Sequence, residues 1–464
     1  MNSNNNLSRL LSYSLLASVV ALTGCLSQPR DERVAEQLPA AFSSEEELPA
    51  PPPTGWLQSF ADPALNRWVD QAVQDNFDIN AALARLEAAR QQRIIAGSTL
   101  WPSLGLELDG QRSKTVNSGS TDYDTNFAAN AVISWELDLW GRLRDGRKAA
   151  DYLYQAQQAD LDYLRLSLAG QVAQAWYNVE AATQLQELLR QRVDNLRTNL
   201  DIIEYGYRQG INAALDVYLA RTDLSAEMNN LYQQQASTRD AIRRLQLLLG
   251  QYPSGEMPEA GSDATLPELP ALDISQLTTE TVRYRYDLQS AYLELLATDR
   301  DLAAAHKARF PSFSLTGRAG DSSDELDTLL DTSSLAWNLL ANLSQPLFAG
   351  GRLKAAEEQQ RQLVLEKEQQ YLQALHAAFS EVAQALTNET SLNQRLEQVE
   401  EAKKFAEAAE TIAFDEYRKG LSEYTAVLEA QRRAFAAQNT VVTIRNQLLQ
   451  NRIQLLLALG GHYQ

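Results

Sequence analysis

The amino-acid sequence predicts a duplicated α+β fold in which each half of the chain contributes two strands and a set of very long helices. Three observations support this prediction. The same landmark residues occur twice, in the same order, about 210 residues apart. Prolines are absent between Pro102 and Pro253 and again after Pro346, as long uninterrupted helices require. Four segments alternate apolar and polar residues with the period of two that is typical of half-buried strands.

The landmarks mark corresponding boundaries in the two halves. They are Trp101-Pro102 and Phe310-Pro311 before the strands, Gly141-Arg142-Leu143 and Gly351-Arg352-Leu353 at the start of the long helices, Tyr207-Arg208-Gln209-Gly210 and Tyr417-Arg418-Lys419-Gly420 at their breaks, and Leu249-Gly250 and Leu459-Gly460 at their ends. Their spacings agree to within about one residue, which indicates duplication of one unit rather than a solenoid. The predicted domains are a first structural repeat over 55–250, a linker over 251–275, a second repeat over 276–460 and a C-terminal tail over 461–464.

The N-terminus has the features of a secretion signal. Residues 1–24 combine the single charge of Arg9 with an apolar stretch that is too short to span a bilayer, so we exclude them from the fold as a signal peptide. The sequence Leu-Thr-Gly-Cys ending at Cys25 resembles the lipobox of bacterial lipoproteins, which implies N-palmitoyl and S-diacylglycerol groups on Cys25. The alternative is an ordinary secretory signal followed by a chance cysteine. Leu26, rather than aspartate, follows Cys25, which favours sorting to the outer membrane. Residues 25–54 are rich in Pro, Glu and Ser and are predicted to form a lipidated tether.

The composition excludes several functional classes. Lys and Arg total 41 against 60 Asp and Glu, a net charge of −19, so no basic surface for nucleic acid is expected. Mean hydropathy is −0.36, and no later run of about 18 apolar residues offers a membrane-spanning helix. His306, His376 and His462 are far apart and no catalytic motif occurs, so we predict no enzyme, no metal site and no cofactor beyond the lipid. After Cys25 the only methionines are Met228 and Met257, which argues against a Cu(I)-specific exporter.

The alternating segments are predicted to be strands of about ten residues, with a Gly-, Ser-, Asp- and Asn-rich loop between the first two. They cover residues 102–109, 127–139, 313–319 and 335–343. Strands of this length can cross an outer membrane when tilted, although a water-soluble sandwich would show the same alternation. Because about eight strands are the fewest that close a barrel, four strands that span a membrane must be combined with those of other chains.

The helices are predicted to form coiled coils. Apolar residues between Leu161 and Ile203 recur with a mean step of about 3.5, and a helix over 142–206 would be on the order of 95 Å long. Shorter helices over 77–100 and 212–249 together nearly match its length. The second half supplies predicted helices over 279–308, 353–416 and 422–459. A solvated coiled-coil rod without a pore is the alternative.

The breaks in the long helices are predicted to be hairpin tips, remote from the strands. Gly210 and Gly420 stand where a helix ends in a left-handed residue. Asn212 and Ser422 are expected to cap the helices that follow. Arg208 and Arg418 either contact the exposed carbonyl groups at the helix ends or serve as docking residues for a partner protein. The two roles are compatible.

These segments together resemble the outer-membrane efflux protein family, the TolC-like channels, and most specifically their lipoprotein branch of the NodT and OprM type. The residues that carry the resemblance are the segments 56–65, Trp101-Pro102-Ser103-Leu104, 135–143, 345–352 and the paired Tyr-Arg-X-Gly tips. The resemblance implies a homotrimeric TolC-like α/β barrel with four transmembrane strands per subunit, in the outer membrane of a Gram-negative bacterium and with a large periplasmic portion. It also implies a periplasmic adaptor protein and an inner-membrane transporter of the resistance-nodulation-division (RND) type as partners.

The function so implied is passive export of drugs or other small molecules, as the outer-membrane channel of a tripartite efflux system that the adaptor opens at the helical tips. The resemblance places the periplasmic aperture at Glu429 and Thr425, with Leu219 and Leu215 at the corresponding positions of the first half. The adaptor-contact tips are Tyr207, Arg208, Gly210, Tyr417, Arg418 and Gly420. Two alternatives remain open: an exit duct for type I protein secretion, and a non-conducting structural lipoprotein. The exported substrates remain open as well.

Overall fold

A computed structural model describes residues 55–117, 119–257, 266–269, 282, 284–329 and 335–461. The predicted signal peptide, Cys25 and the tether up to Thr54 lie outside the described residues, as do most of the linker and His462.

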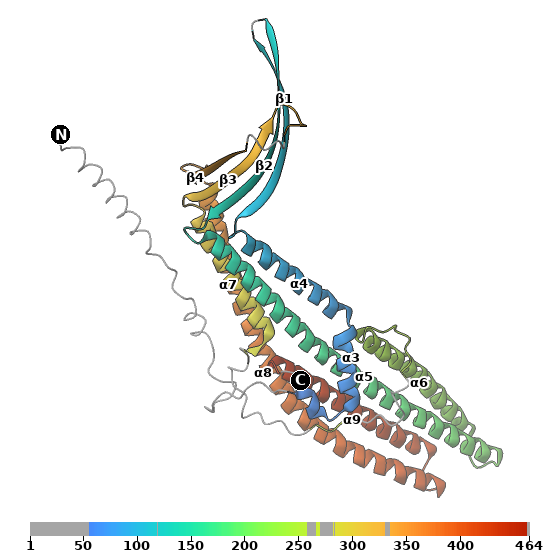
Figure 1. The fold of residues 1–464 in the computed structure, drawn as a ribbon. Helices are drawn as coiled ribbons and strands as arrows, with labels where there is room; N and C mark the ends of the chain where they lie inside the picture. Colours follow the sequence, from blue (N-terminus) through green and yellow to red (C-terminus); the bar gives the residue numbers. More distant parts are fainter. Residues whose placement is uncertain are drawn as a thin grey trace, which may run out of the picture.

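The described chain confirms the predicted fold class (Figure 1). Each half contains a helix, two strands, a long helix and a return helix in the same order, and the first half has η1 and α3 in addition. The elements are η1 (Trp56–Phe60), α3 (Pro63–Asp75), α4 (Phe77–Ser98), β1 (Ser103–Asn117), β2 (Ser120–Leu137), α5 (Arg142–Arg208), α6 (Ala214–Leu248), α7 (Tyr286–Lys307), β3 (Ser312–Ser323), β4 (Ala336–Ser344), α8 (Arg352–Arg418) and α9 (Tyr424–Ala458). Helices α5 and α8 each have 67 residues, α6 and α9 each have 35, and α4 and α7 each have 22.

The long helices connect the sheet to the tips at the opposite end of the molecule (Figure 1). At about 1.5 Å per residue, α5 and α8 are each roughly 100 Å long. Helices α4 and α6 pack along successive parts of α5, and α7 and α9 do the same along α8. Helix α5 also packs against α7 and α9, which joins the two halves. None of the described helices is both long and apolar enough to cross a membrane.

The four described strands form one antiparallel sheet in the order β1-β2-β3-β4. Its register gives the sheet two unlike faces, because alternate side chains point to opposite sides. The apolar face carries Leu104, Leu106, Leu108, Ala131, Ile133, Trp135, Leu137, Phe313, Leu315, Gly317, Ala319, Trp337, Leu339, Ala341 and Leu343. The other face carries mostly polar residues, including Ser103, Glu107, Asn130, Ser134, Thr316, Arg318, Asn338 and Asn342. On this polar face Arg318 and Glu107 form an ion pair of 3.4 Å.

The prediction of a loop between the first two strands is wrong. Strands β1 and β2 continue through it to Asn117 and Ser120, so that they form a long hairpin. The sequence placed the end of the first strand where the alternation of apolar and polar residues stops, after Leu108. The alternation stops there because neither face of the hairpin is predominantly apolar beyond this point, although the strand itself continues. Backbone pairing continues along both strands to Asn117 and Ser120.

Two helical regions also differ from the prediction. Helix α3 was not foreseen; Asn76 separates it from α4, where its Oδ1 accepts hydrogen bonds from the amides of Asp78 and Ile79. The helix predicted from residue 279 begins as α7 at Tyr286, because the buried Arg285 has an extended backbone and its side chain binds Asp287, Glu381 and the Ala458 carbonyl.

The predicted caps of the return helices are wrong as well. The N-cap residues are Ala213 and Glu423, not Asn212 and Ser422. The Asn212 amide instead turns back and donates to the Ile203 carbonyl at 3.2 Å. The carboxylate of Asp216 accepts from the Ala213 amide at 3.2 Å, so the first turn of α6 is satisfied from within the helix.

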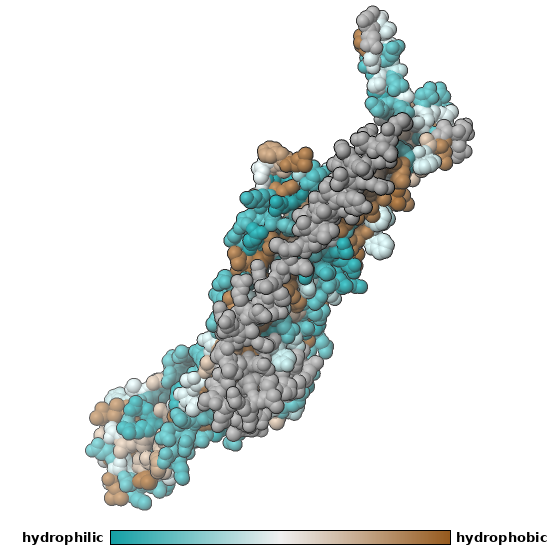
Figure 2. Space-filling model, turned by 90° about the vertical axis from the view of Figure 1, so that its left-hand side faces the viewer, coloured by the Kyte–Doolittle hydropathy of each residue, from teal (hydrophilic) through white to brown (hydrophobic). Residues whose placement is uncertain are grey.

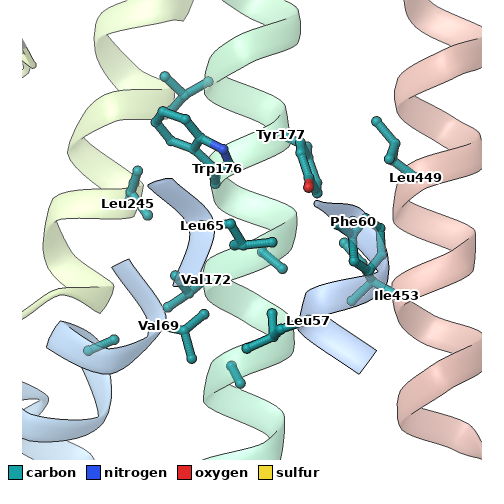
Figure 3. Packing of buried hydrophobic residues seen from close by; sticks show 14 of the residues in the cluster. Leu57, Phe60, Leu65, Val69, Val172, Trp176, Tyr177, Leu245, Leu449 and Ile453 are labelled. Carbon is teal, nitrogen blue, oxygen red and sulfur yellow. The ribbon is translucent and has the colours of Figure 1, made fainter. Parts of the chain in front are cut away.

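The largest apolar core lies halfway along the molecule, where η1 and α3 pack against α5, α6 and α9 (Figure 3). Leu57, Phe60 and Leu65 enter between the long helices and are nearly inaccessible to solvent. Asp62 fixes this N-terminal segment: it caps α3 through the amides of Ala64 and Leu65, and its Oδ2 accepts from the Trp176 indole at 2.7 Å.

Glu180 makes this core sensitive to pH. Burial, with a smaller contribution from the charge of Asp62, raises the pKa of Glu180 from 4.5 to about 7. Between these two values the folded chain holds a proton that the unfolded chain has released, so stability falls as pH rises through this window and stays at its lower level above it. We expect Glu180→Gln to stabilise the protein at pH 8 by about 1–2 kcal/mol, because the side chain is partly exposed and solvent screens it, and to have little effect at pH 5.

Thermal unfolding at the two pH values measures this difference. The matched control is Glu187→Gln, since Glu187 lies on the same helix and its pKa is lowered by hydrogen bonds from Arg190 and Gln191. Equal effects of Glu180→Gln at both pH values would contradict the assignment.

Candidate functional site at the helical tips

The two tips have the same backbone design. Gly210 and Gly420 adopt φ of 73° and 72°, the left-handed conformation that the sequence predicts. In each tip the amide after the glycine donates to a carbonyl five residues earlier, from Ile211 to Gly206 and from Leu421 to Glu416, at 2.9 Å. Ile211 and Leu421 are 78% and 75% exposed. Figure 2 shows hydrophobic side chains gathered at this end of the molecule.

The side chains of the two tips have unlike surroundings. Tyr207 is half exposed, whereas Tyr417 packs against Tyr424 with 5.6 Å between ring centroids. Arg208 donates from Nε to the Glu204 carbonyl in the last turn of α5 at 3.3 Å. Arg418 is exposed.

A groove lies in the first tip, between α5 and α6. Its volume is about 280 Å³, and its lining includes Tyr207, Arg208, Tyr218 and Arg221. Arg221 is tied to the groove wall by an ion pair of 2.7 Å with Glu204. The groove therefore offers two aromatic rings and two cations at the exposed end of the molecule.

An apolar cluster joins the two hairpins just above the tips. Ile203 from α5 and Val217 and Ala220 from α6 contact Tyr424 and Val427 from α9, and all five are buried. Sequence analysis placed Ile203 in the coiled-coil stripe of α5. It did not reveal that the stripe continues across to the second hairpin.

Arg192 provides a charged link between the hairpins, and sequence analysis missed it. From α5 its Nε donates to Glu227 on α6 at 2.7 Å, and its Nη1 donates to the Gln431 carbonyl on α9 at 3.0 Å. Its guanidinium also lies 5.0 Å from the Phe435 ring centroid. One helical heptad further on, Asn199 donates to the Gln431 side chain at 3.3 Å. A polar pair seven residues apart beside an apolar stripe was the signal that could have revealed this link.

Acidic residues surround this arginine. Burial raises the pKa of Asp223 and of Glu410, while the charge of Arg192 opposes the increase in both. The link between the hairpins thus consists of one largely buried cation, 13% exposed, with several carboxyl groups around it. Removing the cation would leave those carboxylates without compensation.

The residues predicted for the aperture lie on an accessible face of α9. Thr425 and Glu429 are one turn apart, on the side away from the buried Tyr424. The Glu429 carboxylate accepts hydrogen bonds from Arg433 and from Arg432, both at 2.7 Å. These bonds lower the pKa of Glu429, and the bond from Arg433 has the larger effect. Its role in an aperture stays a prediction, because a ring of such residues needs further chains.

The corresponding residues of the first hairpin lie on the outer surface of α6. Leu215 is 65% exposed and Leu219 is partly exposed. These leucines and the aperture residues therefore occupy equivalent surfaces of the two return helices, and the described chain covers neither surface completely.

Other charged groups in the described chain form ion pairs rather than a metal centre. His306 lies 3.2 Å from Glu357, whose carboxylate also binds Arg309 and Arg361. Among the described residues no group of three or more His, Cys, Asp or Glu side chains is placed to hold a metal ion.

Comparison with known proteins gives a family match over most of the chain. The model of the family described as "Outer membrane efflux protein" matches residues 68–251 and 279–461. The "Probable outer membrane lipoprotein SilC" of Salmonella typhimurium is 29% identical over 98% of this chain and 98% of its own length. The "Toluene efflux pump outer membrane protein TtgF" of Pseudomonas putida is 30% identical over 97% and 96%.

Solved structures share the fold. The outer-membrane channel OprN matches with a TM-score of 0.83 and 25% identity, covering 92% of this chain and 97% of that chain. A structure of CusC matches with a TM-score of 0.84 and 26% identity, covering 95% and 99%.

Proposed function

Because the chain belongs to the outer membrane efflux protein family and is the outer-membrane channel component of an efflux system, we propose that three copies form a passive export conduit gated at the helical tips. In this proposal energy is supplied by an inner-membrane transporter of RND type, and the chain performs no catalytic step. The observation that carries the proposal is the two-faced sheet, apolar on one side and polar on the other.

The sheet accounts for the trimer. Four strands leave both edges unpaired, and unpaired edges in lipid cost several kcal/mol for each group. Three chains pool twelve strands, the apolar face meets lipid, and the polar face lines the lumen. Glu107 and Arg318 then project into water rather than into hydrocarbon.

The tip contacts account for gating. The cluster around Ile203 and the bonds of Arg192 hold the second hairpin against the first. An adaptor protein that binds the tips would open the conduit by separating the hairpins, and Glu429 and Thr425 would then move away from the channel axis.

Reconstituted efflux tests this function. Cells that lack their own outer-membrane channel should expel a fluorescent dye when they express this chain together with its cognate adaptor and pump. Expression of any two of the three components should leave dye accumulation unchanged. Protein export with an ATP-driven exporter, in the absence of dye efflux with the pump, would contradict the proposal and favour type I secretion.

The groove in the first tip is the proposed adaptor site. It combines Tyr207 and Tyr218 with the cations Arg208 and Arg221, a composition suited to a mixed aromatic and charged contact. The paired change Tyr218→Ser and Arg208→Glu should abolish adaptor capture and dye efflux and leave trimer assembly intact. The control is Tyr232→Ser, an equally exposed tyrosine on α6 outside the groove, which should retain both. Unchanged adaptor capture by the groove variant would move the adaptor site elsewhere.

Lipidation of Cys25 is the last part of the proposal. Multiple acyl chains anchor a protein stably, since each buried methylene contributes about 0.8 kcal/mol. We expect Cys25→Ser to lose labelling by radioactive palmitate and to keep partial efflux activity, because the sheet would still insert. Label retained by Cys25→Ser would refute the assignment.

A further inference from the structure

The hairpin of β1 and β2 extends well beyond the rest of the sheet. Pairing of β2 with β3 ends at the rung of Phe127 and Ser323, whereas β1 and β2 remain paired from Gly110 to Asn117. We call residues 110–117 and 119–127 the projecting hairpin. It points away from the helices (Figure 1), and hydrophilic side chains predominate on its visible surface (Figure 2).

Charges on the projecting hairpin are sorted by face. The side that continues the apolar face of the sheet carries Gly110, Arg112, Lys114 and Val116 of β1, opposite Phe127, Thr125, Tyr123 and Thr121 of β2. The side that continues the polar face carries Gln111, Ser113 and Thr115, opposite Asn126, Asp124 and Asp122. The cations and aromatic rings therefore share one side and the carboxylates the other, in a chain whose net charge is −19.

Both cations are held on one tyrosine ring. The guanidinium carbon of Arg112 lies 5.3 Å, and Nζ of Lys114 5.7 Å, from the centroid of Tyr123. Tyr123 itself is 60% exposed. Within the part of the chain that the structure describes, neither cation forms an ion pair. Asp321 of β3 lies on the same side of the sheet, but it pairs with Ala129. That position is closer to the helices than any residue of the projecting hairpin.

The position of this pair along the sheet suggests what it binds. Arg112 follows Leu108, the last leucine of the β1 stripe, by four residues, a rise of about 13 Å along the strand. Cations and an aromatic ring directly above a lipid-facing apolar band lie at the level of lipid headgroups. Because the helices lie on the periplasmic side, this is the outer leaflet, whose glycolipids carry phosphate groups.

We propose that Arg112 and Lys114, held on Tyr123, bind the phosphate groups of the phosphorylated glycolipid of the outer leaflet. Charge-assisted bonds to phosphate are the strongest that these side chains form. The opposite side of the projecting hairpin, which carries the carboxylates, faces the mouth of the conduit. The cations therefore face the lipid phosphates outside the barrel, and the carboxylates lie at the exit. This inference rests on the proposed orientation of the sheet in the outer membrane.

Lipid binding by the intact, detergent-solubilised trimer tests the proposal. Native mass spectrometry would follow titration with bis-phosphorylated lipid A, with the same lipid A after removal of its phosphates, and with inorganic phosphate. The wild type should bind the phosphorylated lipid about tenfold more tightly than the dephosphorylated one. Arg112→Gln with Lys114→Gln should abolish this preference, and Arg112→Lys with Lys114→Arg should retain it.

The opposite side of the hairpin supplies the matched control. Asp122→Asn with Asp124→Asn alters two charges on the same hairpin and should keep the preference. Equal affinity of the wild type for both lipids, or a preference that survives in the glutamine variant, would overturn the proposal. Displacement of lipid A by millimolar inorganic phosphate would also overturn it, because the site would then serve a free anion. The glutamine variant should still support dye efflux. This assay therefore separates failure of the lipid-binding proposal from failure of the proposed channel function.

Discussion

Trimers with Arg192→Met and Asn199→Ala should carry several-fold more current across a planar bilayer than the wild type. The wild-type arginine donates charged hydrogen bonds to Glu227 and to the Gln431 carbonyl, and Asn199 adds a third bond to Gln431. Loss of such contacts costs about 2–3 kcal/mol. If the open form lacks these contacts, the ratio of closed to open tips should fall by about 30- to 150-fold.

A nearby exposed arginine provides the control. Arg197 lies on the same helix, and its ion pair with Asp194 is more than half exposed, with side-chain exposures of 56% and 63%. Such pairs contribute about 0–1 kcal/mol, so Arg197→Met should conduct like the wild type. Equal currents from the wild type and from the Arg192 variant would show that these bonds do not close the channel.

Replacement of Arg452 by methionine should destabilise the protein by about 3–5 kcal/mol, since it leaves the Glu389 carboxylate buried without its cation. The Glu389 side chain is 2% exposed and that of Arg452 is 7% exposed. The arginine donates from both Nε and Nη2 to Oε1 of Glu389, and Asn451 donates to the other carboxylate oxygen at 2.9 Å. This network fixes the register of α8 against α9.

A double variant separates the cost of the unpaired charge from the cost of altered packing. Arg452→Met combined with Glu389→Leu should restore most of the lost stability, because an apolar pair of similar volume often replaces a buried ion pair at little cost. Arg445→Met, seven residues earlier on α9, removes a more exposed pair with Glu400 and should cost less than about 1 kcal/mol. Thermal unfolding of the four proteins measures these differences, and equal instability of the single and double variants would contradict the explanation.

Periodicity predicted the helices well because packing and sequence agree along them. The apolar stripe on α5 and the prolines that flank the helical regions determined the predicted lengths, and Gly210 and Gly420 adopt the left-handed conformation expected at the tips. The strands within the sheet were equally clear. Their alternation reflects one apolar face, which is largely exposed in the single chain, and one mostly polar face.

Contacts between distant segments could not be predicted in this way. The hairpin beyond Leu108 has no apolar face, so its pairing leaves no hydrophobic pattern. The predicted cap at Asn212 is wrong because its side-chain amide bonds back to the Ile203 carbonyl rather than to the helix that follows it. The predicted cap at Ser422 is wrong because its hydroxyl donates to the Glu423 carbonyl at 3.3 Å.

The link through Arg192 depends on which helix lies beside α5. The spacing of Arg192 and Asn199, seven residues apart beside the apolar stripe, indicates a polar contact there but does not identify the partner helix.

The mass of the purified, detergent-solubilised particle tests the central claim most directly, because four strands per chain enclose a conduit only when several chains contribute them. Light scattering, corrected for bound detergent, should give three times the mass of one acylated chain at all protein concentrations measured. A particle with the mass of a single chain would contradict the account.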